Sequence, residues 1–292
     1  MSAAPVTPHP TPPATPAAAH RGAAPARRAT SFSLRRVAAL ARAETLLLLR
    51  NGTALFNAIA ISPLFVLFFS TVSGTLGPDA DPDVAGPLIL QQLVSMSLLF
   101  VVYYNLTTTY VARRQELVLK RLLTGECSRP ELLAAAAVPA LLITAVQLLL
   151  GYAAVALLLA PPPLANPVLP LLALVLVTPT LVLLAAATSG VSRTVESAQL
   201  TTLPALAVLM VFSGVVTPGG GEGGFDDVAR FTPMHAVAAL FRLGLTGTGT
   251  DGAPLALGET FAQAALPVAV LLAWAGVAWY AARRWMRWEP QR

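Results

Sequence analysis

The chain has 292 residues, of which 55% are hydrophobic and only 11% are charged, and its mean hydropathy is +0.68. A soluble domain carries about 25% charged residues, so this composition excludes an ordinary soluble protein and predicts a membrane protein. The net charge of +5 does not point to nucleic acid as a partner, because the basic residues flank apolar segments and form no face with interleaved aromatic residues. The single cysteine excludes an intrachain disulfide framework, and the three widely spaced histidines predict no bound metal.

The first 50 residues divide into a tail and a helix. Residues 1–30 hold seven prolines and much alanine without apolar periodicity, which predicts a disordered tail. Residues 32–50 set arginines among leucine, valine and alanine in an amphipathic helical pattern that suits the membrane surface. The alternative is a water-facing extension of the first spanning helix, and we favour the surface helix.

Six later segments have the length and apolarity to cross a bilayer, whose hydrocarbon core of about 30 Å takes roughly 20 helical residues. Their approximate bounds are 53–74, 88–110, 132–160, 168–189, 198–216 and 260–282. The fifth is the weakest of them, since it is the shortest and contains Pro204. The predicted fold is therefore an all-α integral membrane protein with six transmembrane helices, and residues 31–292 form its transmembrane domain.

The distribution of Lys and Arg predicts the orientation of these spans. In a six-span arrangement 17 of the 19 basic residues fall on one side, and only Arg230 and Arg242 fall on the other, together with eight acidic residues. Because cytoplasmic loops carry an excess of Lys and Arg, both termini are expected to be cytoplasmic.

Enzyme motifs are absent from the sequence, which has no Walker A pattern, no H-E-x-x-H and no G-x-S-x-G. No carboxylate lies securely inside a span. A charge at the bilayer centre costs about 2.5–3.5 kcal/mol on insertion scales, so a chain coupled to protons or sodium ions is expected to keep one for that purpose. The milder polar residues within the spans either line a path or hydrogen-bond helices together. The candidates for a path are Asn57, Gln91, Asn105, Thr201 and Thr202.

The most charged part of the chain is "RRQELVLKRLLTGECSRPELL", residues 113–133, between the second and third spans. Its first half has a leucine stripe along one helical face and a favourable i,i+4 acid–base pair that starts at Glu116. Gly125 is typical of a helix end, and Ser128 with Glu131 forms an S-x-x-E capping box. The pattern predicts a short amphipathic cytoplasmic helix, a stop, and then a capped membrane helix.

This segment resembles the run that follows the second span in permeases of the ABC-2 type transporter family, which reads like E-R-x-x-G/L-x-L-x-R-L-x-x-x-P-x-S-x-x-E-L-L. The matching positions are Glu116, Lys120, Arg121, Leu122, Ser128, Glu131 and Leu132. The family's usual proline is replaced by Gly125-Glu126-Cys127. "VFSGVVTP" (211–218) resembles the end of the family's fifth span, and "FTPMHAVAALFRLGL" (231–245) resembles its extracellular re-entrant or amphipathic segment. With the topology, the resemblance covers roughly residues 32–290.

The resemblance implies the permease subunit of an ATP-binding-cassette exporter, which is not itself an enzyme and binds no cofactor. It implies a homodimer, or a pair with a related permease, and cytoplasmic ATPase subunits on separate chains that hold ATP and magnesium. The family's cargo includes drugs, antibiotics, lipids and glycans. One Lys against eighteen Arg suggests a bacterial source, and hence the bacterial plasma membrane.

The resemblance also assigns roles to residues. Coupling to the ATPase falls on Arg114, Glu116, Leu119, Lys120, Arg121 and Leu122. The extracellular segment includes Ser213, Gly214, Pro218, Pro233 and Arg242.

Two other classes stay open beside the exporter. A secondary transporter is expected to show an internal repeat and a midplane ion site, and neither is clear in the sequence. A membrane-embedded enzyme or assembly factor needs a catalytic cluster near one interface, which His235 alone does not supply.

Overall fold

A computed structural model describes the chain over residues 32–76, 82–116, 127–213, 224–249 and 252–286. These residues are helical apart from their connections, and the strand-like feature among them is an isolated antiparallel bridge between Thr248 and Pro254. The predicted all-α class is therefore confirmed for this part of the chain. The predicted tail, residues 1–30, lies outside the described residues.

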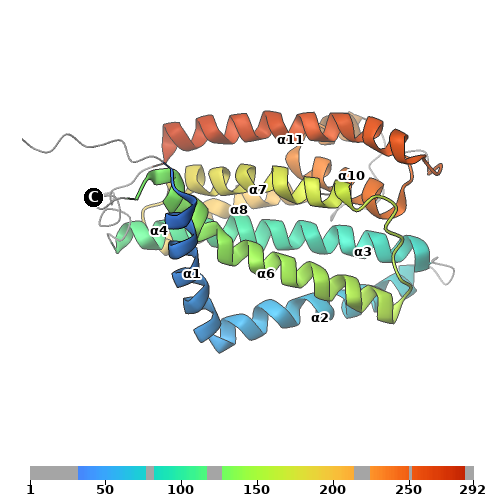
Figure 1. Ribbon diagram of the computed structural model, residues 1–292, viewed down its shortest axis with the longest axis horizontal. Coiled ribbons are helices and arrows are strands. Elements are labelled where there is room, and N and C mark those ends of the chain that lie inside the picture. The colour runs from blue at the N-terminus through green and yellow to red at the C-terminus, as the bar shows by residue number, and fades with distance from the viewer. Residues whose placement is uncertain (1–31, 77–81, 117–126, 214–223, 250–251, 287–292) are drawn as a thin grey trace, which may run out of the picture. The chain divides into compact units, whose positions relative to one another are not determined.

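Figure 1 shows the helices in chain order. Their bounds are α1 Leu34–Arg50, α2 Gly52–Leu76, α3 Pro82–Met96, the π-helix η1 Ser97–Tyr104, α4 Asn105–Gln115, α6 Arg129–Leu158, α7 Val168–Ser189, α8 Val195–Val211, α9 Gly224–Ala229, α10 Pro233–Thr246 and α11 Leu257–Trp285.

Among the described residues, four helical stretches are long and apolar enough to cross a membrane, and they match the predicted second, third, fourth and sixth spans. They are Val84–Gln115, which joins α3, η1 and α4, and Arg129–Leu158, Val168–Ser189 and Leu257–Trp285. The predicted first and fifth spans coincide with α2 and α8, whose apolar parts are shorter, Ile59–Thr71 and Val195–Val211. The multi-pass character is thus confirmed, while the count of six remains a prediction.

α7 lies at the centre of the packing, since α4, α10 and α11 all contact it. Fully buried apolar residues recur along it at every fourth position: Leu169, Ala173, Val177, Leu181 and Ala185. Residues four apart share one face of a helix, so this stripe is the side of α7 that faces the interior.

The end of α7 meets the end of α11 through a glycine. A Cβ placed on Gly190, the residue that follows α7, would lie 1.9 Å from the backbone oxygen of Trp285. No side chain fits at that distance, so the absence of one at residue 190 lets the two backbones touch.

α1 runs across the direction of the long helices and packs against α6 (Figure 1). Only Asn51 separates it from α2, which also packs along α6. We call the end of the helices at which α1 lies the α1 end.

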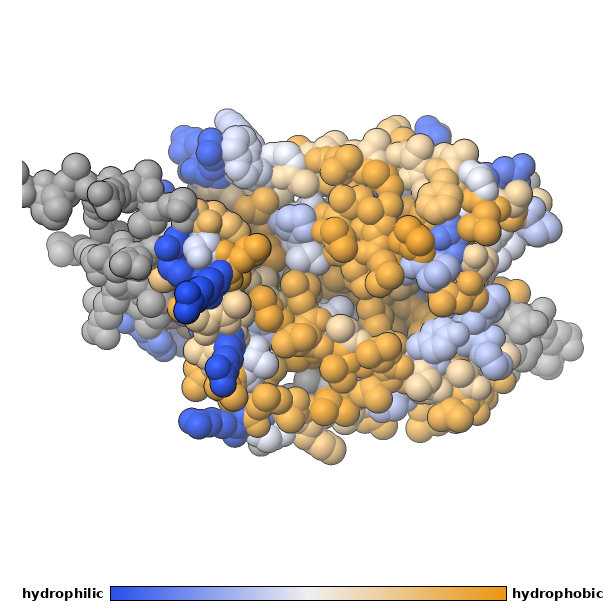
Figure 2. All heavy atoms as spheres, in the orientation of Figure 1, coloured by the Kyte–Doolittle hydropathy of each residue, from blue (hydrophilic) through white to orange (hydrophobic). Residues whose placement is uncertain are grey.

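Hydrophobic side chains cover the middle of the face in Figure 2, whereas strongly hydrophilic ones gather along α1 and towards the two ends of the long helices. α2 contributes large apolar side chains that stay exposed, among them Phe56, Leu64 and Phe68. An apolar band bounded by polar ends suits a surface surrounded by lipid.

Candidate functional site

The charged segment between α4 and α6 is the first candidate for a functional site. Leu119, Lys120, Arg121 and Leu122 belong to residues 117–126, which lie outside the described residues. The structure does describe both flanks of that stretch, namely the end of α4 with Arg114 and Glu116, and the start of α6 with Ser128 and Glu131. These flanks lie at the α1 end.

Arg114 points inward. Its side chain is 1% exposed, although it lies one residue before the end of α4. Its guanidinium donates to the backbone oxygen of Ser189 at 2.9 Å and to that of Ser192, and both acceptors lie where α7 ends and the turn to α8 begins. A cation at the C-terminus of a helix is favourable, because the last carbonyls there lack partners within the helix. Arg114 therefore fastens α4 to the end of α7 and offers no surface to another chain.

Glu116 has the opposite character. It follows the last residue of α4, its backbone N–H donates to the oxygen of Ala112 at 3.0 Å, and its side chain is exposed. The neighbouring Gln115 is also exposed and donates through Nε2 to the backbone oxygen of Arg193 at 3.4 Å. Of the two described residues in the predicted coupling set, Glu116 alone presents its side chain to the outside.

Glu131 binds the start of α1 to the start of α6. Its Oε2 accepts the backbone N–H of Ser128 at 2.7 Å, which is the predicted capping contact. Its Oε1 accepts from the backbone N–H of Ser33 at 2.6 Å and from Nη2 of Arg36 at 2.8 Å. The side chain of Glu131 is 0% exposed. Charge-assisted hydrogen bonds to a buried carboxylate are strong, so this contact holds α1 firmly against α6.

A second ion pair holds α1 to α4. Arg113 lies 2.5 Å from the carboxylate of Glu44, and both side chains are partly exposed, at 17% and 27%. α1 is thus fastened to both helices that flank residues 117–126. Sequence patterns did not reveal either link from α1. The available signal was that Glu44 and Glu131 are among the few acidic residues in the arginine-rich part of the chain.

The predicted path residues do not gather into one described site. The side chain of Asn57 lies outside the description, Asn105 is exposed, and Gln91 is half-buried. Thr202 is fully buried, and its hydroxyl donates to Ala198 of its own helix at 2.5 Å. Thr201 is exposed, and its hydroxyl lies 2.5 Å from that of Ser192. The hydroxyls of both threonines therefore form hydrogen bonds with neighbouring protein groups, which explains why polar residues occur at these two positions.

Another polar cluster lies at the start of η1, where sequence patterns assigned no site. The hydroxyl of Ser97 donates to Oε1 of Gln147 at 2.7 Å, and that of Ser62 donates to the backbone oxygen of Gln147. All three side chains are at most 4% exposed. The cluster joins α2, η1 and α6, which is the role expected of polar residues that hydrogen-bond membrane helices together.

The predicted extracellular residues that the structure describes lie just after α8 and along α10. Gly214 and Pro218 fall outside the described residues. Ser213 is fully buried just after α8, and its hydroxyl donates to the oxygen of Met210 at 2.7 Å. Pro233 is the first residue of α10, and Arg242 is half-buried and donates to the backbone oxygen of Gly249 at 3.0 Å.

α10 itself is largely buried, with Met234 and Leu240 fully enclosed, and it packs on α7 and α11. It ends at Gly247, whose φ of 63° is the left-handed conformation that glycine adopts readily. The segment predicted to be an extracellular re-entrant or amphipathic one is therefore a helix packed among the others, and its apolar side chains belong to the core.

Comparison with known proteins gives one match, to a family. The family model described as ABC-2 type transporter matches residues 35–245, from α1 to the end of α10. That range includes both flanks of residues 117–126 and the ion pairs made by α1. No match was found among curated proteins or among solved structures.

Proposed function

The chain belongs to the ABC-2 type transporter family, and from this premise we propose that it is the permease subunit of an ATP-binding-cassette exporter. A separate cytoplasmic ATPase binds ATP and magnesium and supplies the energy. The permease moves a hydrophobic or amphiphilic substrate, such as a drug, antibiotic, lipid or glycan, out of the cell. The observation that carries the proposal is the family match over the helices that frame a charged segment, residues 117–126.

In this proposal the α1 end faces the cytoplasm of a bacterial cell. The distribution of basic residues supports that orientation, since 17 of 19 fall on this side of a six-span arrangement. The acidic Glu259 lies at the start of α11, the end of that helix opposite the one that meets α7, and this end faces outward.

The coupling contacts fall on the exposed part of this end. Glu116 presents its carboxylate, and Lys120 and Arg121 follow it in the stretch between the flanks. A partner that pushes on residues 117–126 displaces the end of α4 on one side and the start of α6 on the other. Because Arg114 fastens α4 to the α7–α8 turn, the displacement of α4 also reaches the centre of the packing. The buried position of Arg114 makes it a positioning residue here.

Two copies of the permease, or one copy and a related permease, form the transporter, and the substrate passes between them. Asn57, Gln91, Asn105 and Thr201 remain candidates for residues along that path. Thr202 is set aside, because its hydroxyl is buried and bonded within α8.

Co-expression with an ATPase encoded beside this chain tests the proposal. We expect the two chains to purify together, and we expect the permease to stimulate ATP hydrolysis. Glu116→Ala and Arg121→Glu should lower this stimulation while the chain still inserts into the membrane. Arg230→Ala is the matched control, because it removes an exposed ion pair, with Asp227 at 3.0 Å, that lies outside the predicted coupling set.

Failure of the two chains to copurify, together with unstimulated hydrolysis, would sink the exporter assignment. Substrate movement driven by a proton or sodium gradient without an ATPase would identify a secondary transporter instead. Loss of insertion in the Glu116 or Arg121 variants would show that this stretch is needed only for folding.

A further inference from the structure

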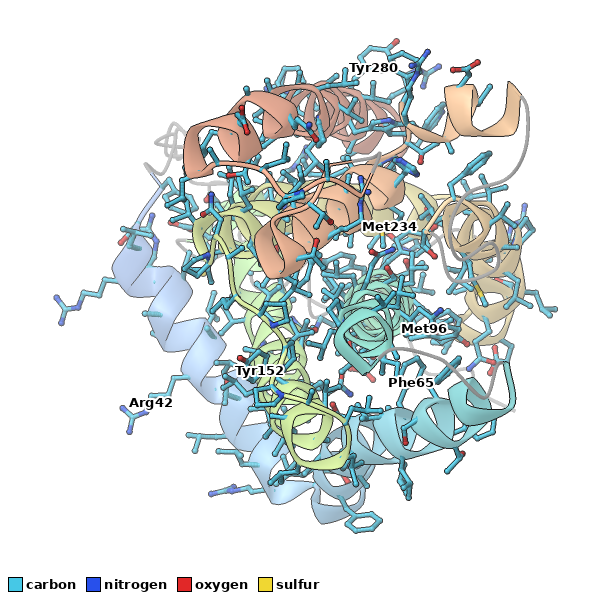
Figure 3. All side chains as sticks on the ribbon, turned by 90° about the vertical axis from the view of Figure 1, so that its right-hand side faces the viewer. Arg42, Phe65, Met96, Tyr152, Met234 and Tyr280 are labelled. Carbon is cyan, nitrogen blue, oxygen red and sulfur yellow. The ribbon has the colours of Figure 1, made fainter. Side chains whose placement is uncertain are left out.

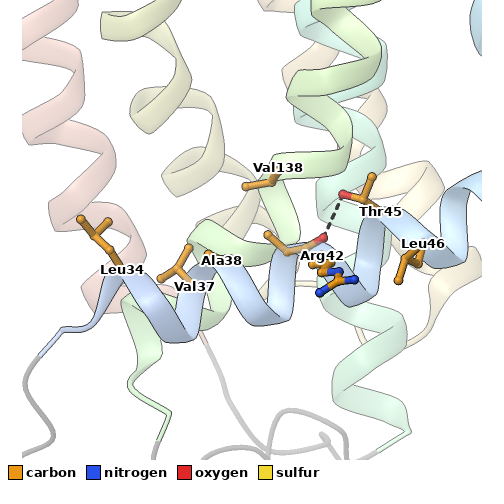
Figure 4. A pocket seen from close by; sticks show the side chains of 8 residues that line it. Leu34, Val37, Ala38, Arg42, Thr45, Leu46 and Val138 are labelled. Carbon is orange, nitrogen blue, oxygen red and sulfur yellow. Dashed lines mark hydrogen bonds between the residues drawn. The ribbon is translucent and has the colours of Figure 1, made fainter.

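A shallow apolar groove of about 620 Å³ lies between α1 and α6 (Figure 4). Its lining comes from one face of α1 and one residue of α6: Leu34, Val37, Ala38, Ala41, Arg42, Thr45, Leu46 and Val138. The volume falls within the range of about 300–1,000 Å³ that is usual for small-molecule sites. The hydroxyl of Thr45 donates a hydrogen bond to the backbone oxygen of Ala41 at 2.8 Å, so this donor is already satisfied within α1. The lining therefore suits a hydrocarbon ligand.

Charge at the groove comes from a single side chain. Arg36 and Glu44, also on α1, are engaged by Glu131 and Arg113. Arg42 is exposed, forms no ion pair with any residue that the structure describes, and extends away from the helices in Figure 3. The groove thus joins an apolar floor to one available guanidinium at its rim.

We propose that this groove binds an anionic phospholipid of the cytoplasmic leaflet, with an acyl chain along the α1–α6 groove and the headgroup phosphate on Arg42. The proposal rests on the orientation given under the proposed function, in which α1 lies at the cytoplasmic surface. That leaflet carries anionic lipids, and each basic residue near it contributes roughly 1 kcal/mol, or about fivefold in affinity.

Charge also decides against a second copy of this chain as the occupant. The face of the molecule at the α1 end is strongly basic, with arginines at positions 35, 42 and 50 all exposed on α1 itself. Another copy would bring the same charges against them, and like charges across an interface are unfavourable. Exposed apolar side chains at both ends of the groove, Leu34 at 76% and Leu46 at 45%, are the surface that an acyl chain would cover.

The test measures lipid binding to the full-length chain in detergent by native mass spectrometry. The probes are a phosphatidylglycerol and a phosphatidylcholine with identical acyl chains. We expect the phosphatidylglycerol to bind with higher occupancy, and Arg42→Gln to weaken it roughly fivefold. Arg50→Gln is the matched control, because Arg50 is exposed on the same helix but does not line the groove.

A second pair of variants tests the apolar part. Ala38→Phe places a ring in the groove, whereas Ala39→Phe adds the same ring at an exposed position outside it. We expect only Ala38→Phe to exclude both lipids, with unchanged thermal stability for both variants.

If Arg42→Gln and Arg50→Gln weakened phosphatidylglycerol binding equally, the proposal would be overturned, because the lipid would then be attracted by the net positive charge of α1 rather than bound in the groove. Equal occupancy of the two lipids in the unsubstituted chain would also overturn it. Because the measurement needs no ATPase, its failure is distinguishable from failure of the exporter assignment, which is decided by copurification and hydrolysis.

Discussion

Arg114 offers the sharpest test of how the α1 end is built. Arg114→Met keeps an unbranched apolar stem but removes the guanidinium that reaches the oxygens of Ser189 and Ser192. A hydrogen bond from a charged donor contributes about 1.5–3 kcal/mol. Two such bonds are partly offset by the cost of burying the cation, so we expect a net loss of about 2–4 kcal/mol.

The matched control is the preceding arginine. Arg113→Met removes an ion pair whose two side chains are 17% and 27% exposed, and pairs near the surface contribute about 0.2–1 kcal/mol. At roughly 2–4 °C of midpoint per kcal/mol, the Arg114 variant should lower the unfolding temperature by about 4–16 °C and the Arg113 variant by at most about 4 °C. Arg114→Lys should fall between them, because a single ammonium does not reproduce the fork of the guanidinium.

Tryptophan fluorescence of the detergent-purified chain, which contains four tryptophans, reports the unfolding midpoint on heating. Similar midpoints for Arg114→Met and Arg113→Met would refute the inward clamp. A second refutation concerns function: if Arg114→Lys lost its ATPase partner at an unchanged midpoint, Arg114 would be a direct coupling contact after all.

Three further experiments test neighbouring contacts. Gly190→Ala should cost about 1–3 kcal/mol through overpacking against the backbone of Trp285, seen as a lower unfolding midpoint; an unchanged midpoint would mean that the two helix ends do not touch. Glu131→Gln should speed amide hydrogen exchange in residues 34–50 of α1 while leaving α7 protected, since the bonds that hold α1 to α6 are weakened; equal exchange in both proteins would contradict that link. A double-mutant cycle with Glu44→Gln and Arg113→Gln should give a coupling of about 0.2–1 kcal/mol that shrinks with added salt, and strict additivity would show that the pair contributes nothing.

Much of the fold was predictable because the signal is local. α7 has the bounds predicted for the fourth span, since a continuous apolar run stops at a serine and a glycine. The capping residue Glu131 was also predictable, because the S-x-x-E motif spans only four consecutive positions, 128–131. The third and sixth spans differ from their predicted ends by a few residues, as expected where polar side chains continue a helix beyond its apolar part.

The second span shows where local reasoning falls short. Its helix continues to Gln115, five residues past the predicted end, and includes two arginines. Their charge predicts that both arginines face water. Arg114 is instead buried, whereas Arg113 forms an ion pair with Glu44 near the surface. Which arginine turns inward depends on where the carbonyls at the end of α7 lie, some 75 residues further along the chain.

By itself, the sequence determined that this is an all-helical membrane protein, where most of its apolar helices begin and end, and where its charges concentrate. Hydrophobicity and charge are properties of consecutive residues, so a pattern reveals them directly. Only the tertiary structure decided that α1 is fastened to α4 and α6, that Arg114 is a clamp, and that α10 lies in the core. These contacts join residues far apart in the chain, and a hydrogen bond depends on distance in space rather than on separation in sequence.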